Sequence, residues 1–127
     1  MKLVVLRNGV LALLATASLA CRSAWAQDAE AGKAVFKAQC SICHSAERSR
    51  NLTGPSLFGI IGSRSGQMES FNYTDATRNA GVVWTPETLD LYLTEPKGVV
   101  PHNTMVYGGL RDASKRANLI AYLGTLR

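Results

Sequence analysis

The sequence predicts an all-α domain of three to five short helices. Apolar residues recur at helical spacing in separated segments, no segment alternates as a half-buried strand does, and glycines and prolines punctuate the stretches between. We expect the first 26 of the 127 residues to be a leader, which leaves 101 residues for the domain. A domain of that size buries only about two-thirds of its unfolded surface. A large apolar cofactor would complete so thin a core.

The first 26 residues have the pattern of an export signal, and residues 27–127 form the domain. Two basic residues precede an apolar run at 10–20, and Ala24-Trp25-Ala26 is a small-x-small cleavage site. We expect cleavage after Ala26 and a periplasmic location. A retained membrane anchor is the first alternative, but a span needs about 20 apolar residues and this run is shorter. Lipoprotein processing at Cys21 is the second, although a serine lies three positions earlier.

The charge of the remaining chain argues against nucleic acid as a partner. Past residue 26 there are 11 Lys and Arg residues against nine Asp and Glu, a net charge of +2. These basic residues are dispersed, and the longest run is Lys115-Arg116. Binding to a phosphate backbone requires several converging cations. We therefore expect no nucleic-acid partner. We also expect no stable membrane insertion, and we expect the protein to be a monomer.

Four segments carry helix signals. The first runs from Asp28 to about Gln39, with acids before lysines and apolar residues at helical spacing. Thr74 caps a short segment that ends at Gly81, and Thr85-Pro86 begins another, which Pro96 ends. The last begins near Asp112 and has a broad apolar face. Between the first two segments, residues 45–73 show no sustained period, which is typical of a functional loop or of one packed on a cofactor.

Cys40-Ser41-Ile42-Cys43-His44 is the C-x-x-C-H signature of covalent c-type haem attachment. Two thiols one helical turn apart can each add to a vinyl group of the porphyrin, and the imidazole of His44 then faces the iron. A thioredoxin-like dithiol needs a βαβ context that is missing, and zinc needs two more ligands, of which His102 is the only other histidine. A disulfide between Cys40 and Cys43 would close too short a loop to stabilise the domain much. We expect one covalent haem c.

Three residues could bind the iron opposite His44, namely Met68, His102 and Met105. Met105 follows the segment 96–101, whose two prolines we expect to hold a non-helical segment stiffly against one haem face. Met68 lies in a loop between polar neighbours without such a brace. Position therefore favours Met105 and leaves the other two open.

From about Asp28 to Arg127 the chain resembles a class I cytochrome c of the short-loop type, shared by mitochondrial cytochrome c and small bacterial cytochromes. The matching pieces occur in order along the chain: Gly32 and Phe36, Cys40 to His44, Thr53 to Leu57, Gly66-Gln67, Phe71 to Ala76, Trp84, Leu89, Tyr92-Leu93, Pro96-Lys97, Pro101, Met105 and Leu119 to Leu123. The resemblance implies the small cytochrome c fold around one covalent haem, with His44 and Met105 as axial ligands of the iron.

The resemblance also implies roles for residues around the haem. The carbonyl of Pro55 would accept a hydrogen bond from the ring of His44 and fix its tautomer. Three aromatic residues would use their polar tips near the haem, namely Tyr73, Trp84 and Tyr92. Tyr92 would donate toward the sulfur of Met105, and the other two toward a haem propionate. Plain core packing is the alternative for these aromatic residues.

Two departures from the family's pattern concern charge. Ser63 stands where the family commonly places an arginine near a propionate, and Arg64 follows it, so a contact of Arg64 with the propionate stays open. Of the basic residues that ring the haem edge in mitochondrial proteins, Lys97 remains and Arg111 replaces another, while Tyr107 covers the edge. We expect redox donors and acceptors to dock there, on a less positive face.

A haem with both axial positions filled by side chains has no open site for oxygen or peroxide, which favours one-electron transfer over catalysis. The sequence therefore predicts a soluble electron carrier, not an enzyme, that shuttles electrons between respiratory, photosynthetic or dehydrogenase complexes. A dedicated haem subunit of one dehydrogenase or reductase is an alternative. A ligand-binding or peroxidatic haem protein, in which Met105 is displaced, is another.

Overall fold

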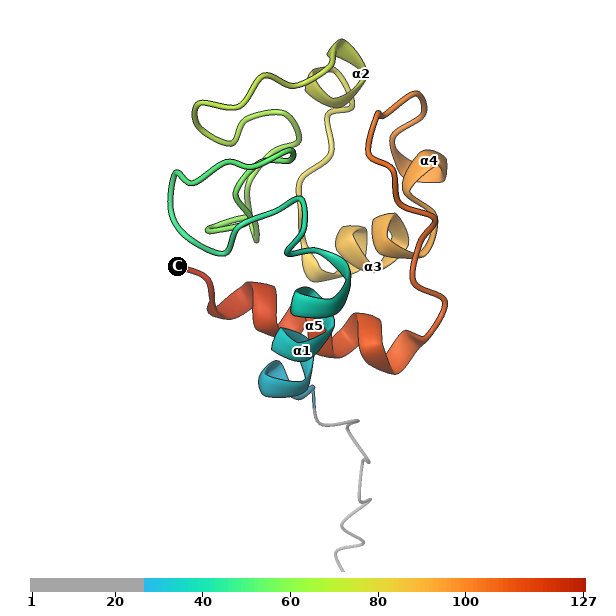
Figure 1. Ribbon diagram of the computed structural model, residues 1–127. Coiled ribbons are helices and arrows are strands. Elements are labelled where there is room, and N and C mark those ends of the chain that lie inside the picture. The colour runs from blue at the N-terminus through green and yellow to red at the C-terminus, as the bar shows by residue number, and fades with distance from the viewer. Residues whose placement is uncertain (1–26) are drawn as a thin grey trace, which may run out of the picture.

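A computed structural model describes residues 27–127, which fold into five helices joined by long loops (Figure 1). The helices are α1 (Ala29–Gln39), α2 (Asp75–Arg78), α3 (Pro86–Thr94), α4 (Pro96–Val99) and α5 (Ala113–Thr125). Residues 27–127 contain no strand, and Arg64 and Val83 form one isolated antiparallel bridge. The all-α prediction is confirmed. The predicted leader, with Cys21 and the cleavage site at Ala26, lies outside the described residues.

Side-chain caps set the starts of the helices. The carboxylate of Asp28 accepts hydrogen bonds from the first turn of α1, and that of Asp112 accepts one from the first turn of α5. Thr74 and Thr85 cap α2 and α3 in the same way. These oxygens satisfy backbone N–H groups that have no partner inside a helix. All four predicted starts are confirmed, but α2 ends at Arg78, earlier than expected.

The segment 96–101 was expected to be non-helical, and this prediction was wrong. Pro96 begins one helical turn, α4, in which the N–H of Val100 donates to the Pro96 carbonyl at 3.0 Å. A proline fits the first position of a helix because its φ is already helical and its missing N–H would have had no partner there. Pro96 therefore ends α3 and begins α4.

The core lies where α1 crosses α5 (Figure 1). Gly32 on α1 is the point of closest approach, because a Cβ atom there would lie 1.9 Å from the carbonyl oxygen of Asn118 on α5. One turn further along α1, the ring of Phe36 lies 5.4 Å from that of Tyr122 on α5. Leu119, which lies on α5 between Asn118 and Tyr122, has no exposed surface. The absence of a side chain at Gly32 lets these apolar groups meet.

Two loop regions lie above α1, α3 and α5 in the view of Figure 1. In Figure 1 the loops after α1, drawn in green, lie on one side, and α4 with the following segment, drawn in orange, lies on the other. The crossed pair α1 and α5 lies below both, with α3 between them and the loops. Residues 40–44 follow α1 and Met105 follows α4, so they belong to two different segments.

Two helical glycines offer a matched test of the α1–α5 contact. Gly32→Ala should lower the free energy of unfolding by about 2 kcal/mol or more, because the new methyl group meets backbone atoms that cannot move freely. Gly124→Ala in α5 should raise it by about 0.5–1 kcal/mol, since a Cβ there meets nothing within 4 Å and alanine is the better helix former. Urea unfolding measures both. Equal effects would contradict this account of the crossing.

Candidate functional site

The turn after α1 carries the two thiols and the imidazole. Cys40 is the C-terminal cap of α1, and its carbonyl accepts hydrogen bonds from the N–H groups of Cys43 at 3.1 Å and His44 at 2.8 Å. The backbone therefore continues for one more turn, which places the thiols one turn apart. Both cysteines are free. Burial raises the pKa of the Cys40 thiol to about 11, so that thiol stays protonated at neutral pH.

The imidazole of His44 is oriented by one hydrogen bond. Its Nδ1 lies 2.8 Å from the carbonyl oxygen of Pro55. Because a carbonyl only accepts, Nδ1 carries the proton and Nε2 keeps a lone pair that can bind a metal. Burial lowers the pKa of His44, and the bond to Pro55 partly opposes that shift. Lowering the pKa favours the neutral imidazole, which is the form that ligates iron.

A loop that folds back on the turn places Pro55 beside His44. The N–H of Gly54 donates to the carbonyl of Cys43 at 2.7 Å, and that of Leu57 donates to the carbonyl of Ser45 at 2.9 Å. A Cβ atom on Gly54 would lie 2.4 Å from Cε1 of His44, so this position leaves room for the ring only as glycine. Sequence reasoning assigned the carbonyl of Pro55 to the ring of His44 but missed this role of Gly54, which was read only as part of a loop.

The thioether of Met105 is held by contacts from two elements. The hydroxyl of Tyr92, on α3, donates to its Sδ at 3.8 Å, and the backbone N–H of Met105 donates to Oδ1 of Asn103 at 3.1 Å. Burial raises the pKa of Tyr92, which keeps its hydroxyl a donor. Met105 and His44 lie near each other.

The other two candidate ligands have different surroundings. Met68 lines a surface cavity of about 290 Å³ with Arg48, Phe58 and Arg127. His102 is exposed, and its backbone has a φ of 63°, a left-handed conformation that residues other than glycine seldom adopt. Tyr73 forms its hydrogen bond with the backbone of Met68, whereas the hydroxyl of Tyr92 donates to the sulfur of Met105.

The aromatic residues named from the sequence fall into two groups. Trp84 is buried, its ring lies 4.8 Å from that of Tyr92, and its backbone is paired with Gly62 and Ser63. The ring of Tyr73 instead meets that of a neighbouring phenylalanine edge-on at 4.9 Å, and burial raises the pKa of Tyr73 to about 12. Trp84 and Tyr92 therefore form one cluster beside Met105, and Tyr73 lies in another.

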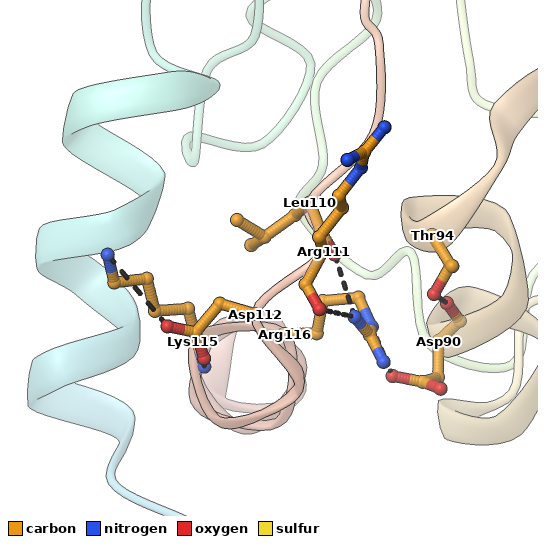
Figure 2. Close-up of polar contacts among 7 residues, drawn as sticks. All are labelled: Asp90, Thr94, Leu110, Arg111, Asp112, Lys115 and Arg116. Atoms are coloured by element: carbon orange, nitrogen blue, oxygen red, sulfur yellow. Dashed lines mark hydrogen bonds and ion pairs between the residues drawn. The ribbon is translucent and has the colours of Figure 1, made fainter.

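The segment that carries Met105 is anchored at its far end by a buried arginine (Figure 2). The guanidinium of Arg116, on α5, donates to the carbonyls of Leu110 at 2.7 Å and Arg111 at 2.9 Å, and pairs with the carboxylate of Asp90, on α3, at 2.7 Å. The planar fork of arginine suits this set of acceptors. No pattern in the sequence indicates this role, because Arg116 belongs to a dispersed set of basic residues.

The donor set suits a c-type haem. It comprises two free thiols one turn apart, an imidazole with Nε2 free, and a thioether that a tyrosine hydroxyl holds in place. Within residues 27–127, no three His, Cys, Asp or Glu side chains gather as a metal site, so the zinc alternative has no support there. In the same residues, no helix combines the length and apolar character needed to cross a membrane.

Curated proteins similar to this chain are cytochromes c, whereas no family model matches. Cytochrome c type-1 of Ascaris suum is 49% identical over 76% of this chain and 86% of its own length. Cytochrome c2 of Rhodopila globiformis is 44% identical over 76% of this chain and 91% of its own length. Cytochrome c of Euglena viridis is 39% identical over 79% of this chain and 98% of its own length.

The contact between Gly54 and His44 can be tested directly. Gly54→Ala should displace the imidazole, break its bond to Pro55 and lower the free energy of unfolding by about 2 kcal/mol or more. Urea unfolding and the haem-to-protein absorbance ratio of the purified protein are the measurements. Gly108→Ala is the control, since a Cβ there meets nothing within 4 Å. If the two variants behave alike, Gly54 does not make room for the ring.

Proposed function

Since the chain belongs to the class I cytochrome c family, whose members are electron carriers with one covalent haem c and not enzymes, we propose that Cys40 and Cys43 form the two thioether bonds. His44 and Met105 would be the protein ligands of its iron. When bound, the haem supplies a one-electron redox couple. The observation that carries this assignment is that each proposed ligand has its own orienting partner, Pro55 for the imidazole and Tyr92 for the thioether.

The proposed ligand set makes the protein a carrier. Two protein ligands leave no coordination position for oxygen or peroxide, so electrons pass without a substrate binding the metal. The bond from His44 to Pro55 fixes the tautomer and raises the basicity of the ligand nitrogen. The hydroxyl of Tyr92 holds the sulfur of Met105 in place through oxidation and reduction. Trp84, packed on Tyr92, and Tyr73 are the proposed donors to the haem propionates.

The place of action follows from the leader. We propose that residues 1–26 are removed after Ala26 during export and that the protein works in the periplasm. The similarity to cytochromes c2 of Rhodopila globiformis and Blastochloris viridis supports a bacterial carrier of this kind. Its partners are redox proteins.

The proposed docking face surrounds the haem edge. Ile42 lies between the two cysteines and is 86% exposed, and Val106, next to Met105, is fully exposed. The hydroxyl of Tyr107 donates to Oε1 of Gln39 at 2.8 Å, which links the two segments that carry these aliphatic side chains. Lys97 and Arg111 supply positive charge, and Figure 2 shows the side chain of Arg111 pointing away from Asp90. The face therefore combines exposed apolar groups with few charges.

Replacing Met105 tests the ligand assignment. Met105→His should lower the reduction potential by at least about 100 mV, or about 2 kcal/mol, because histidine stabilises ferric iron better than a thioether does. Met105→Ala should abolish the sulfur-to-iron charge-transfer band and admit carbon monoxide to the reduced protein.

Met68→Ala is the matched control and should leave the band, the potential and carbon monoxide binding unchanged. Loss of the band in Met68→Ala, with retention in Met105→Ala, would overturn the assignment. Rapid stoichiometric carbon monoxide binding by the unaltered protein would instead favour a ligand-binding haem protein over a carrier.

The mass of the exported protein tests attachment and processing together. We expect a chain that begins at Gln27 and carries one haem, with no disulfide because both cysteines are used. Mass spectrometry of protein recovered from the periplasm measures this. A mass without haem would contradict the proposed thioether bonds, and a chain that retains Cys21 would contradict the cleavage site.

Charge reversal tests the docking face. Lys97→Glu and Arg111→Glu should each lower the association rate with a redox partner roughly twofold or more at low ionic strength, with a smaller effect at high salt. Stopped-flow electron transfer measures this. Arg127→Glu is the control, since the C-terminal end lies on the other side of the molecule from α4 (Figure 1). Equal rates for all three variants would place docking elsewhere.

A further inference from the structure

Asn103 is a buried polar residue two positions before Met105. It is 8% exposed, and its side chain makes three hydrogen bonds. Its Nδ2 donates to the carbonyls of Val100 at 2.7 Å and Pro96 at 3.2 Å, and its Oδ1 accepts from the N–H of Met105 at 3.1 Å. Two carbonyls need donors and one N–H needs an acceptor, so this orientation of the amide is the one that satisfies all three groups.

The segment that carries Met105 has few backbone contacts of its own. Within residues 101–110, three backbone N–H groups donate to backbone carbonyls. The N–H of Asn103 donates to Val100 at 3.3 Å, that of Tyr107 to Met105 at 3.1 Å, and that of Leu110 to Leu93 at 2.7 Å. Of these, only the bond from Leu110 reaches another helix. The N–H of Met105 is satisfied by the side chain of Asn103 and not by backbone. The placement of Met105 relative to α4 therefore depends on one side-chain amide.

We propose that Asn103 is a positioning residue that keeps the sulfur of Met105 on the iron by tying the Met105 backbone to both ends of α4. This inference rests on the proposed ligation by Met105. Removing the amide breaks three hydrogen bonds and leaves the carbonyls of Pro96 and Val100 and the N–H of Met105 without these partners in a largely buried place. The unsatisfied groups favour an open form of the segment, in which they reach water. In that form Met105 gives way to an external ligand more easily.

Asn51 provides a matched control, because it makes the same three kinds of bond elsewhere. Its Nδ2 donates to the carbonyls of Ser70 at 3.0 Å and Glu69 at 3.3 Å, and its Oδ1 accepts from the N–H of Ser56 at 2.9 Å. Ser56 follows Pro55, so Asn51 ties a loop on the His44 side of the site. Asn51→Leu therefore removes three bonds of the same kinds, two of them in a more exposed place, without touching the Met105 segment.

The experiment measures imidazole binding to the oxidised, haem-loaded protein, because imidazole must displace the sulfur in order to bind. The charge-transfer band reports the displacement. Asn103→Leu should strengthen imidazole binding by about fivefold or more, the factor expected from loss of about one net hydrogen bond. Asn51→Leu should change it by less than about twofold, even where urea unfolding shows a similar loss of global stability. Asn103→Ser should give an intermediate effect, since a hydroxyl can still donate once and accept once.

The outcomes separate this inference from the proposed function. Stronger imidazole binding in the Asn103 variants but not in Asn51→Leu supports the inference. If Asn103→Leu does not fold, the measurement on Asn103→Ser decides the outcome. Unchanged binding in the Asn103 variants, or an equal rise in Asn51→Leu, overturns it while ligation by Met105 stands. An unaltered protein that lacks the charge-transfer band overturns ligation by Met105, and this inference falls with it.

Discussion

The close crossing of α1 and α5 is the contact on which both sides of the site depend. α1 runs directly into the turn that carries Cys40 and His44, and α5 carries Arg116, which holds the segment leading back to Met105. A single missing side chain, at Gly32, lets the two helices approach closely. A change in that distance would therefore move both groups that the proposed haem needs. The thin protein core makes this dependence stronger, because few other helix contacts exist to compensate.

The two sides of the site are built in different ways. On the His44 side, backbone groups position the ring. The loop folds back through hydrogen bonds between main-chain atoms, and the carbonyl of Pro55 accepts the bond from the imidazole. On the Met105 side, side chains from α3, α5 and the segment itself hold the backbone and the sulfur. Backbone pairing gives a fixed position, whereas each side-chain contact can be lost one at a time. The position of Met105 therefore depends on contacts that single substitutions can remove.

Local signals in the sequence predicted much of the fold, and contacts between distant segments explain what they missed. Caps and helical spacing predicted four helix starts, and the C-x-x-C-H motif located the thiols and imidazole because its chemistry lies within five consecutive residues. The helical turn α4 was missed because Pro96 was read only as the end of the preceding helix. Gly54 and Arg116 were missed for another reason: their roles arise from groups brought to them by folding, His44 in one case and Leu110 in the other.

The anchor formed by Arg116 also depends on the shape of that side chain where it faces the Met105 segment. The guanidinium presents its N–H donors in a rigid planar fork. Its acceptors there are the carbonyls of Leu110 and Arg111, which do not titrate. A lysine would be a point charge without the fork that reaches both carbonyls and Asp90 together, and a histidine would lose its charge near neutrality. Arginine at this position therefore joins two carbonyls of the segment and a carboxylate of α3 through one rigid group.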